Sequence, residues 1–182
     1  MRETKSTPRD TEMDDEEESG TSEGVFEILK ADHRRVEELF TQFEDADKRA
    51  KTGIAEEALR ELEIHATLEE ELVYPAIREV IEEEDSIDEA LEEHHVAKLL
   101  IKELHKLNPG TEEFAPKFKV LGEIIRHHVE EEENETFPQA EQAGFDDSEL
   151  SEEVMRRKEK LMQKFERSGK KSSGQSRRRK AA

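Results

Sequence analysis

The stretch EIHATLEEELVYP, residues 63–75, has a counterpart near the other end of the chain in HHVEEEENETFP, residues 127–138. In both stretches a His is followed at +4 by a Glu, and at +9 and +10 by an aromatic residue and a proline. The matching residues, offset by 63 positions throughout, are His65 with Glu69 and His128 with Glu132. We interpret the chain as two helical hairpins that close around this pair of motifs.

The aromatic-proline pair makes the duplication specific. A His with a Glu at +4 is a weak signal here, because 49 of the 182 residues are acidic and His33 and His127 meet the same spacing. The chain has only five prolines, eight Phe and one Tyr, and Tyr74-Pro75 and Phe137-Pro138 are its only aromatic-proline dipeptides. Both follow a His-Glu pair at the same distance, so the repeated motif, not the spacing, indicates a site.

Composition narrows the class of protein. A chain of 182 residues with 32% hydrophobic and 43% charged residues suits a single domain with tails and a thin helical core. The formal charge of -20 disfavours a general nucleic-acid binder and suits a protein that attracts cations. The N-terminal residues lack an apolar leader and no run has membrane-spanning length, which predicts a cytoplasmic protein with no membrane partner.

The absence of cysteine excludes several kinds of chemistry at once. Disulfides, thiolate nucleophiles, iron-sulfur clusters and Cys-ligated zinc all require a residue that this chain lacks. Any metal must therefore be bound by His and carboxylate.

The hydrophobic pattern predicts an all-α protein with four long helices and a short fifth helix. The helices are expected at residues 23–50, 54–84, 86–108, 111–143 and 148–167. Pro75 and Pro138 each remove one backbone donor and are expected to kink the second and fourth helices. The predicted divisions are a disordered acidic arm at 1–22, a four-helix bundle at 23–145, a C-terminal helix at 146–168 and a disordered basic tail at 169–182.

Each of the four long helices carries one His on its apolar stripe. In the first helix His33 follows Phe26 and Leu29 and precedes Val36 and Phe40, at steps of three or four residues. In the second and fourth helices a Glu lies one turn after the His, about 5–6 Å away at Cβ, so the two side chains can hold one ion or straddle two. The predicted metal ligands are His33, His65, Glu69, His94, His128 and Glu132.

A purely structural interpretation applies to each His taken singly, because a lone His on an apolar stripe is usually a hydrogen-bonded core residue. The set of six favours metal binding instead, since two buried carboxylates without partners would each cost several kcal/mol and bound cations remove that cost. His95 and His127 are expected to point outward, because each lies about 100° around its helix from an inward His. His105 lies about 16 Å along the axis from His94 and is also expected to be a non-ligand.

The sequence resembles the hemerythrin-like, or HHE cation-binding, domains over about residues 24–145. The resemblance rests on Asp32-His33, the string from His65 to Pro75, Glu92-Glu93-His94 and the string from His128 to Pro138. It implies an up-down-up-down four-helix bundle around a non-haem di-iron centre, with the six residues above as ligands and the two Glu as bridges between the irons.

One departure from the oxygen-carrying members of this family affects the expected function. Those members have a further His four residues after the third-helix His, where this chain has Lys98, and an Asp where it has Glu132. We expect Lys98 on the inward face, where a protonated amine cannot ligate iron. The resemblance therefore favours the broader hemerythrin-like group over reversible oxygen transport.

The predicted function is a di-iron protein that binds, senses or detoxifies oxygen, nitric oxide, peroxide or iron, with a diatomic molecule or peroxide as its ligand. Imidazole and carboxylate suit iron, manganese and zinc alike, and spacing does not choose among them. Two alternatives stay open: a ferroxidase or peroxide-decomposing enzyme, and a metal-stabilised module for protein interaction. Nucleic acid is expected to be contacted, if at all, through the basic tail, and the sequence indicates no particular protein partner.

Overall fold

The computed structural model describes residues 24–82, 85–147 and 149–179, with side chains described as far as residue 168. Every regular element in this part of the chain is helical, which confirms the predicted all-α class. None of the described helices combines the length and the apolar character needed to cross a membrane. The predicted acidic arm, 1–22, and the end of the predicted basic tail, 180–182, lie outside the described residues.

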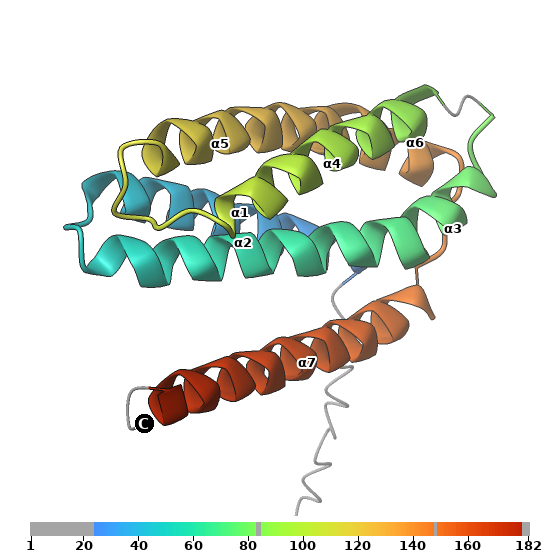
Figure 1. Ribbon diagram of the computed structural model, residues 1–182. Coiled ribbons are helices and arrows are strands. Elements are labelled where there is room, and N and C mark those ends of the chain that lie inside the picture. The colour runs from blue at the N-terminus through green and yellow to red at the C-terminus, as the bar shows by residue number, and fades with distance from the viewer. Residues whose placement is uncertain (1–23, 83–84, 148, 180–182) are drawn as a thin grey trace, which may run out of the picture.

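The described helices form a bundle of four helical rods (Figure 1). Two rods are single helices, and two consist of helices joined end to end through a short π-helical segment. The rods are α1 (Val25–Asp45); α2 (Ala50–Leu68), η1 (Glu69–Val73) and α3 (Tyr74–Arg78); α4 (Asp85–Leu104); and α5 (Phe114–Glu131), η2 (Glu132–Thr136) and α6 (Phe137–Gln142). Because α1 packs against α2 and α4 packs against α5, the chain forms two antiparallel hairpins.

The two π-helical segments stand where kinks were predicted at Pro75 and Pro138. The N–H of Tyr74 donates to the carbonyl of Glu69, five residues back, and the N–H of Phe137 donates to the carbonyl of Glu132 in the same way. A proline lacks an N–H and its ring collides with the carbonyl four residues back. A wider turn just before each proline accommodates both effects, and the helix continues.

The extra residue in each wide turn moves the buried face forward by one position. The predicted stripe of the second helix places Leu72 and Ala76 inside, but both are only partly buried. Val73 and Ile77 are fully buried in their place. The prediction assumes a fixed period of 3.6 residues, which does not allow for an extra residue in one turn. The predicted buried face is therefore wrong by one residue beyond the first His-Glu pair.

A polar layer divides the core of the bundle into two apolar clusters. One cluster contains Phe26, Tyr74 and Phe137, together with residues on the inner side of the fifth helix. The other contains Phe40 and Phe118, whose ring centroids lie 5.0 Å apart. On each rod the predicted His ligand lies between the residues of the two clusters, so apolar packing on both sides holds the polar layer in place.

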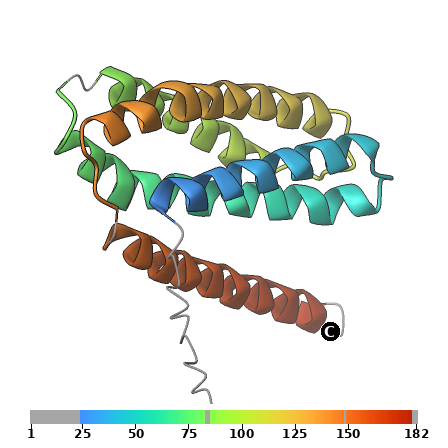
Figure 2. The ribbon, with the colours of Figure 1, turned by 180° about the vertical axis from the view of Figure 1, so that it is seen from behind.

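The fifth helix, α7 (Leu150–Arg179), lies against the face formed by α1 and α2, on the side away from α4 and α5 (Figures 1 and 2). Its buried side chains include Val154 and Leu161. The backbone stays helical beyond the predicted end at 168, through most of the segment predicted as a disordered tail.

Candidate metal centre

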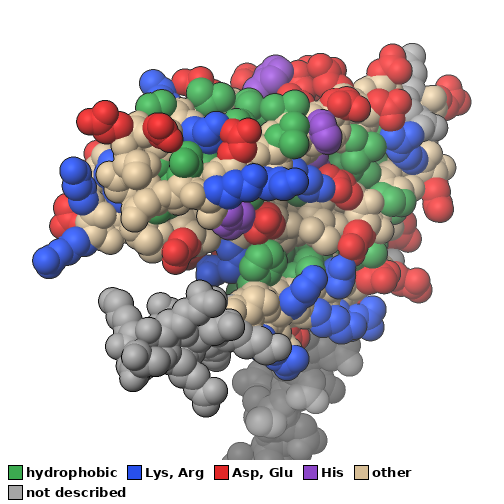
Figure 3. Space-filling model, in the orientation of Figure 1, with side chains coloured by type: hydrophobic (Ala, Val, Ile, Leu, Met, Phe, Trp, Pro, Cys, Tyr) green, Lys and Arg blue, Asp and Glu red, His purple; other side chains and the backbone are tan. Residues whose placement is uncertain are grey.

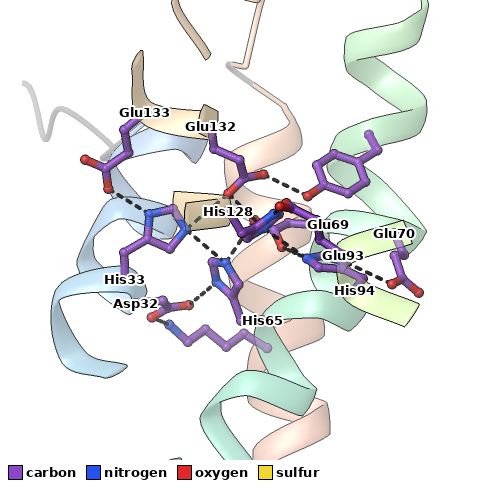
Figure 4. Close-up of polar contacts among 12 residues, drawn as sticks. Asp32, His33, His65, Glu69, Glu70, Glu93, His94, His128, Glu132 and Glu133 are labelled. Atoms are coloured by element: carbon purple, nitrogen blue, oxygen red, sulfur yellow. Dashed lines mark hydrogen bonds and ion pairs between the residues drawn. The ribbon is translucent and has the colours of Figure 1, made fainter. Parts of the chain in front are cut away.

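The six predicted ligands meet in the middle of the bundle (Figure 4). Helices α1, α2, α4 and α5 supply one imidazole each, and the first residue of each π-helical segment supplies a carboxylate. All six residues are buried, with exposed fractions of 6% or less: His33, His65, Glu69, His94, His128 and Glu132. The helical period thus delivers these residues to one place, and their role as ligands stays a prediction.

The imidazoles form two pairs with Glu69 between them. The Nε2 atoms of His33 and His65 lie 3.0 Å apart, and those of His94 and His128 lie 3.1 Å apart. Oε1 of Glu69 is 2.9 Å from Nε2 of His65, and Oε2 is 3.3 Å from Nε2 of His94. Each oxygen of this carboxylate therefore faces one imidazole pair, which is the arrangement that lets one carboxylate bridge two ions.

Glu132 faces both pairs with a single oxygen. Its Oε2 lies 3.3 Å from Nε2 of His33 and 3.4 Å from Nε2 of His128, whereas its Oε1 accepts a hydrogen bond of 2.8 Å from the Tyr74 hydroxyl. Burial and the nearby carboxylates raise the pKa of Tyr74 well above its ordinary value, so the hydroxyl stays a donor. The duplicated position is Phe137, which has no hydroxyl to offer the other carboxylate.

A set of outer carboxylates faces the far side of each imidazole (Figure 4). The pairs, measured from Nδ1 to the nearest carboxylate oxygen, are His33 with Glu133 at 2.7 Å, His65 with Asp32 at 3.7 Å, His94 with Glu70 at 2.9 Å and His128 with Glu93 at 2.9 Å. The contact at 3.7 Å is electrostatic, being too long for a hydrogen bond. An Nδ1–H that faces a carboxylate leaves Nε2 as the free acceptor and makes the imidazole a better ligand.

The outer carboxylates are absent from the sequence prediction, although the duplication contains a signal for them. Asp32 and Glu93 come directly before the first His of each hairpin, and Glu70 and Glu133 come directly after the Glu of each repeated motif. None of the four stands out alone in a chain with 49 acidic residues. Their matched positions relative to the motif are what distinguish them.

Two lysines extend this network outward, and one of them corrects the sequence prediction. Lys98, expected on the inward face, has a side chain that is 43% exposed, and its Nζ pairs with Glu70. A charged amine costs less free energy in contact with solvent than inside a buried cluster of imidazoles, so the lysine side chain extends to the surface. Lys158 of α7 pairs with Asp32 in a similar way, so the fifth helix also contacts the outer carboxylates.

The carboxylates favour positive charge beside them. Burial alone would lower the pKa of His65, but the charge of Glu69 and the contact with Asp32 outweigh it and raise the pKa to about 10. Burial also opposes the charge on His94, but its contact with Glu69 and its hydrogen bond with Glu70 raise its pKa to about 9. In spite of burial, the same two imidazoles hold the pKa of Glu69 well below its ordinary value. The centre thus keeps its carboxylate anionic and attracts cations.

Several buried polar atoms of the centre have no hydrogen-bond partner among the described residues. They are both carboxylate oxygens of Glu69, Oε2 of Glu132 and Nδ1 of His65. Unpaired buried carboxylates cost several kcal/mol each, and a coordinated cation supplies the missing interaction. Imidazole nitrogen and carboxylate oxygen suit iron, manganese and zinc. The residues therefore fit a two-ion site in which each imidazole pair would hold one ion and the two carboxylates would contact both.

The three remaining histidines lie away from the centre, as predicted. His95 and His105 are exposed, and the side chain of His127 is 60% exposed. The helical step of about 100° between neighbours accounts for the outward direction of His95 and His127.

Alanine at His128 is expected to lower the bound metal from about two ions per chain to about one, because its Nε2 belongs to one imidazole pair. Alanine at His127 is expected to leave the equilibrium metal content unchanged, since this side chain lies at the surface. Elemental analysis of both purified variants after dialysis checks this. Equal losses, or a larger loss at His127, would mean that the ligand register is off by one residue.

Comparison with known proteins identifies the family. The sequence profile of the hemerythrin HHE cation-binding domain matches residues 24–140. This range includes all six converging residues and the whole of the four rods except Glu141 and Gln142. The chain belongs to the hemerythrin HHE cation-binding family. The resemblance seen in the sequence is thereby confirmed, and the buried His and Glu cluster is the candidate cation site of this HHE domain.

Two known proteins resemble the chain closely enough to compare. A hemerythrin HHE cation-binding domain protein from Mycobacterium kansasii has the same fold, with a TM-score of 0.66 and 23% identity over 76% of this chain and 87% of that chain. A DNA nickase from Nostoc sp. strain PCC 7120 is 29% identical over 116 residues, which are 62% of this chain and 32% of that protein. The HHE chain therefore spans about a third of the length of the nickase.

Proposed function

We propose that this HHE protein holds two irons in the centre and reacts there with a small oxidant, oxygen or peroxide, instead of carrying oxygen reversibly. Iron, when bound, supplies the electrons for such a reaction. The ligand set of four imidazoles and two carboxylates is compatible with iron, and the position of Lys98 supports reaction over carriage. Its amine lies at the surface, so the position of the carriers' additional His provides no ligand in this chain.

A small apolar cavity beside the imidazoles is the observation that carries this proposal. Its volume is about 20 Å³, enough for one water-sized or diatomic molecule and too small for an organic substrate. Its polar lining includes all four imidazoles of the centre, and its apolar lining consists of Val36, Leu62, Ala66, Ala97, Ile101, Ile125 and Val129. A molecule in this cavity would contact the imidazole side of the centre, and Asp32 and Lys98 complete the lining.

The surrounding residues can hold and deliver protons, which the reduction of oxygen or peroxide consumes. The Tyr74 hydroxyl keeps its proton and donates a hydrogen bond to Oε1 of Glu132. Between the two hairpins, Nδ1 of His94 contacts Glu70 of η1, and Glu70 pairs with the exposed amine of Lys98. This chain of contacts leads from solvent to an imidazole of the centre.

Exposure of the reduced, iron-loaded protein to air is expected to give an oxidised form with near-ultraviolet absorption that argon does not reverse. Ala97→Val narrows the cavity and is expected to slow this oxidation about tenfold, a barrier increase of about 1.4 kcal/mol, while both irons stay bound. Ala58→Val serves as the control, because Ala58 is buried in the same apolar cluster but does not line the cavity. Stopped-flow absorption with iron analysis measures both quantities.

Release of intact oxygen under argon over repeated cycles would contradict the proposal and restore the carrier function. An unchanged oxidation rate in Ala97→Val would mean that the oxidant does not use the cavity. Sustained loss of peroxide over many turnovers would favour a peroxide-decomposing enzyme, and a single turnover would favour a sensor.

The similarity to the nickase is not a basis for proposing a DNA-nicking activity for this chain. The match covers 32% of that protein, and a formal charge of -20 repels a phosphate backbone. We propose no DNA-directed reaction for the bundle.

A further inference from the structure

A polar cavity leads into the centre from the outer side of the second hairpin. It lies between α4 and the rod of α5 and η2, has a volume of about 40 Å³, and is lined by Ser86, Glu89, Ala90, Glu93, His128, Glu131, Glu132, Glu135 and Thr136. His128 and Glu132, two of the predicted ligands, form part of this lining. Acidic side chains and histidines gather on this part of the surface, over α4 and α5 (Figure 3).

Glu93 and Glu131 of the cavity lining and the neighbouring surface residue His127 present metal-ligating atoms to one another. Nε2 of His127 lies 3.3 Å from Oε1 of Glu131 and 3.7 Å from Oε1 of Glu93, and one ligand atom from each residue falls within 4.8 Å of the others. Glu93 also reaches inward, with Oε2 2.9 Å from Nδ1 of His128. One carboxylate therefore connects a surface cluster with an imidazole of the centre.

The inner end of the cavity holds polar atoms that lack partners. Glu132 is 1% exposed, and its Oε2 has no hydrogen-bond partner among the described residues. The buried hydroxyl oxygen of Ser86 is also unpaired within that part of the chain. An anionic oxygen at the end of an acid-lined cavity provides a favourable position for a cation.

The first hairpin offers an internal comparison, because the cavity residues and His127 have counterparts there, offset by 61 residues in the first helix of each hairpin and by 63 in the second. Where the second hairpin has Ser86, Glu89, His127, Glu131, Glu135 and Thr136, the first has Val25, Ile28, Ile64, Leu68, Leu72 and Val73. The apolar counterparts pack in one cluster with Val154 of α7. The bundle therefore folds with this position closed and dry, so the polar residues of the second hairpin are not a requirement of the fold.

The charges at the two positions also differ. Asp32, the counterpart of Glu93, pairs with Lys158 of α7, which places a positive charge over the first hairpin. Glu93 instead has His127 and Glu131 beside it, whereas α7 packs mainly against α1, α2 and η1. A cation approaching the first hairpin meets a lysine, whereas one approaching the second meets carboxylates.

We propose that the acidic cavity is the route by which divalent cations reach the buried centre, with Glu93, His127 and Glu131 capturing each ion first. The proposal rests on the metal centre described above. An acid-lined cleft concentrates cations and raises their association rate. Within the capture cluster Glu93 contacts His127, and on its inner side it contacts His128. Glu132 lies at the inner end of the cavity, so successive carboxylates line the whole path.

Cobalt(II) uptake by the metal-free full chain tests the route, because cobalt absorption in the visible range reports ligation by imidazole. The substitutions Glu131→Gln and Glu135→Gln together keep the shape of the cavity wall and remove two charges. Uptake at low ionic strength is expected to slow about tenfold, while the final content stays at about two ions per chain. Glu123→Gln with Glu130→Gln is the control, since both are exposed on α5 outside this cavity, and a change below about twofold is expected.

An unchanged uptake rate in the cavity variant, or equal slowing in both double variants, would overturn the route. A lower final cobalt content in the cavity variant would also overturn it, because these carboxylates would then hold the ions permanently. If the unsubstituted protein bound no cobalt, the metal centre itself would be wrong, and the route with it.

Discussion

Alanine at Glu69 is expected to lower the metal content from about two ions per chain to below one. Glu69 is the one residue that belongs to both groups of candidate ligands in the centre, with one oxygen facing each imidazole pair. Its loss removes a ligand from both ions and leaves two imidazoles with raised pKa values without their main carboxylate. Elemental analysis of the purified variant, with thermal melting to confirm folding, measures the effect.

Glu56→Ala is the matched control for this substitution, because Glu56 lies on the same rod and is exposed. It removes the same charge and is expected to keep the full metal content. A Glu69→Ala variant that retains two ions would show that the carboxylate does not bridge the imidazole pairs.

Removal of the metal is expected to lower the melting temperature by roughly 10 °C at about pH 7. An ion at a thousandfold excess over its dissociation constant stabilises the folded state by about 4 kcal/mol, which corresponds to a shift of this size in a chain of this length. Chelation leaves the oxygens of Glu69 and Oε2 of Glu132 in the core with imidazole contacts but without hydrogen-bond partners among the described residues. Differential scanning calorimetry with and without a chelator, on protein of measured metal content, checks the shift.

The melting difference is expected to widen as the pH rises toward about 10. In the metal-free protein His65 and His94 have raised pKa values, about 10 and about 9, so their protonated forms stabilise the fold beside Glu69. This stabilisation is fully present at a pH below about 6.5, the pKa of histidine in the unfolded chain. It is lost as the pH rises through the pKa values that His65 and His94 have in the folded protein. Metal binding requires neutral imidazoles, so the stabilisation by bound metal is not weakened as the pH rises toward about 10. A difference that narrows with rising pH would contradict this electrostatic description.

The sequence is sufficient to predict most of the fold and the six converging residues, for a physical reason. The period of 3.6 residues places His33 and His94 among apolar neighbours that must be buried, so burial of the stripe brings the imidazoles inward. The duplicated motif adds Glu69 and Glu132 by the same geometry. The helical periodicity and the repeated motif are therefore the two features of the sequence that predict where these six residues lie.

What the sequence does not predict depends on contacts between distant residues. The π-helical segments follow from the way Tyr74 and Phe137 bond five residues back ahead of a proline, which no regular period contains. The surface position of Lys98 follows from its pairing with Glu70 of another rod. The outer carboxylates reach imidazoles on other helices, and only the packing of the rods selects them among the many acidic residues.

A crystal structure of the iron-loaded protein with anomalous scattering from iron tests the central claim most directly. We predict two anomalous peaks roughly 3.5–4 Å apart, one beside His33 and His65 and the other beside His94 and His128, with Glu69 between them. A single peak, or peaks confined to surface carboxylates with none between the imidazole pairs, would contradict the two-ion centre.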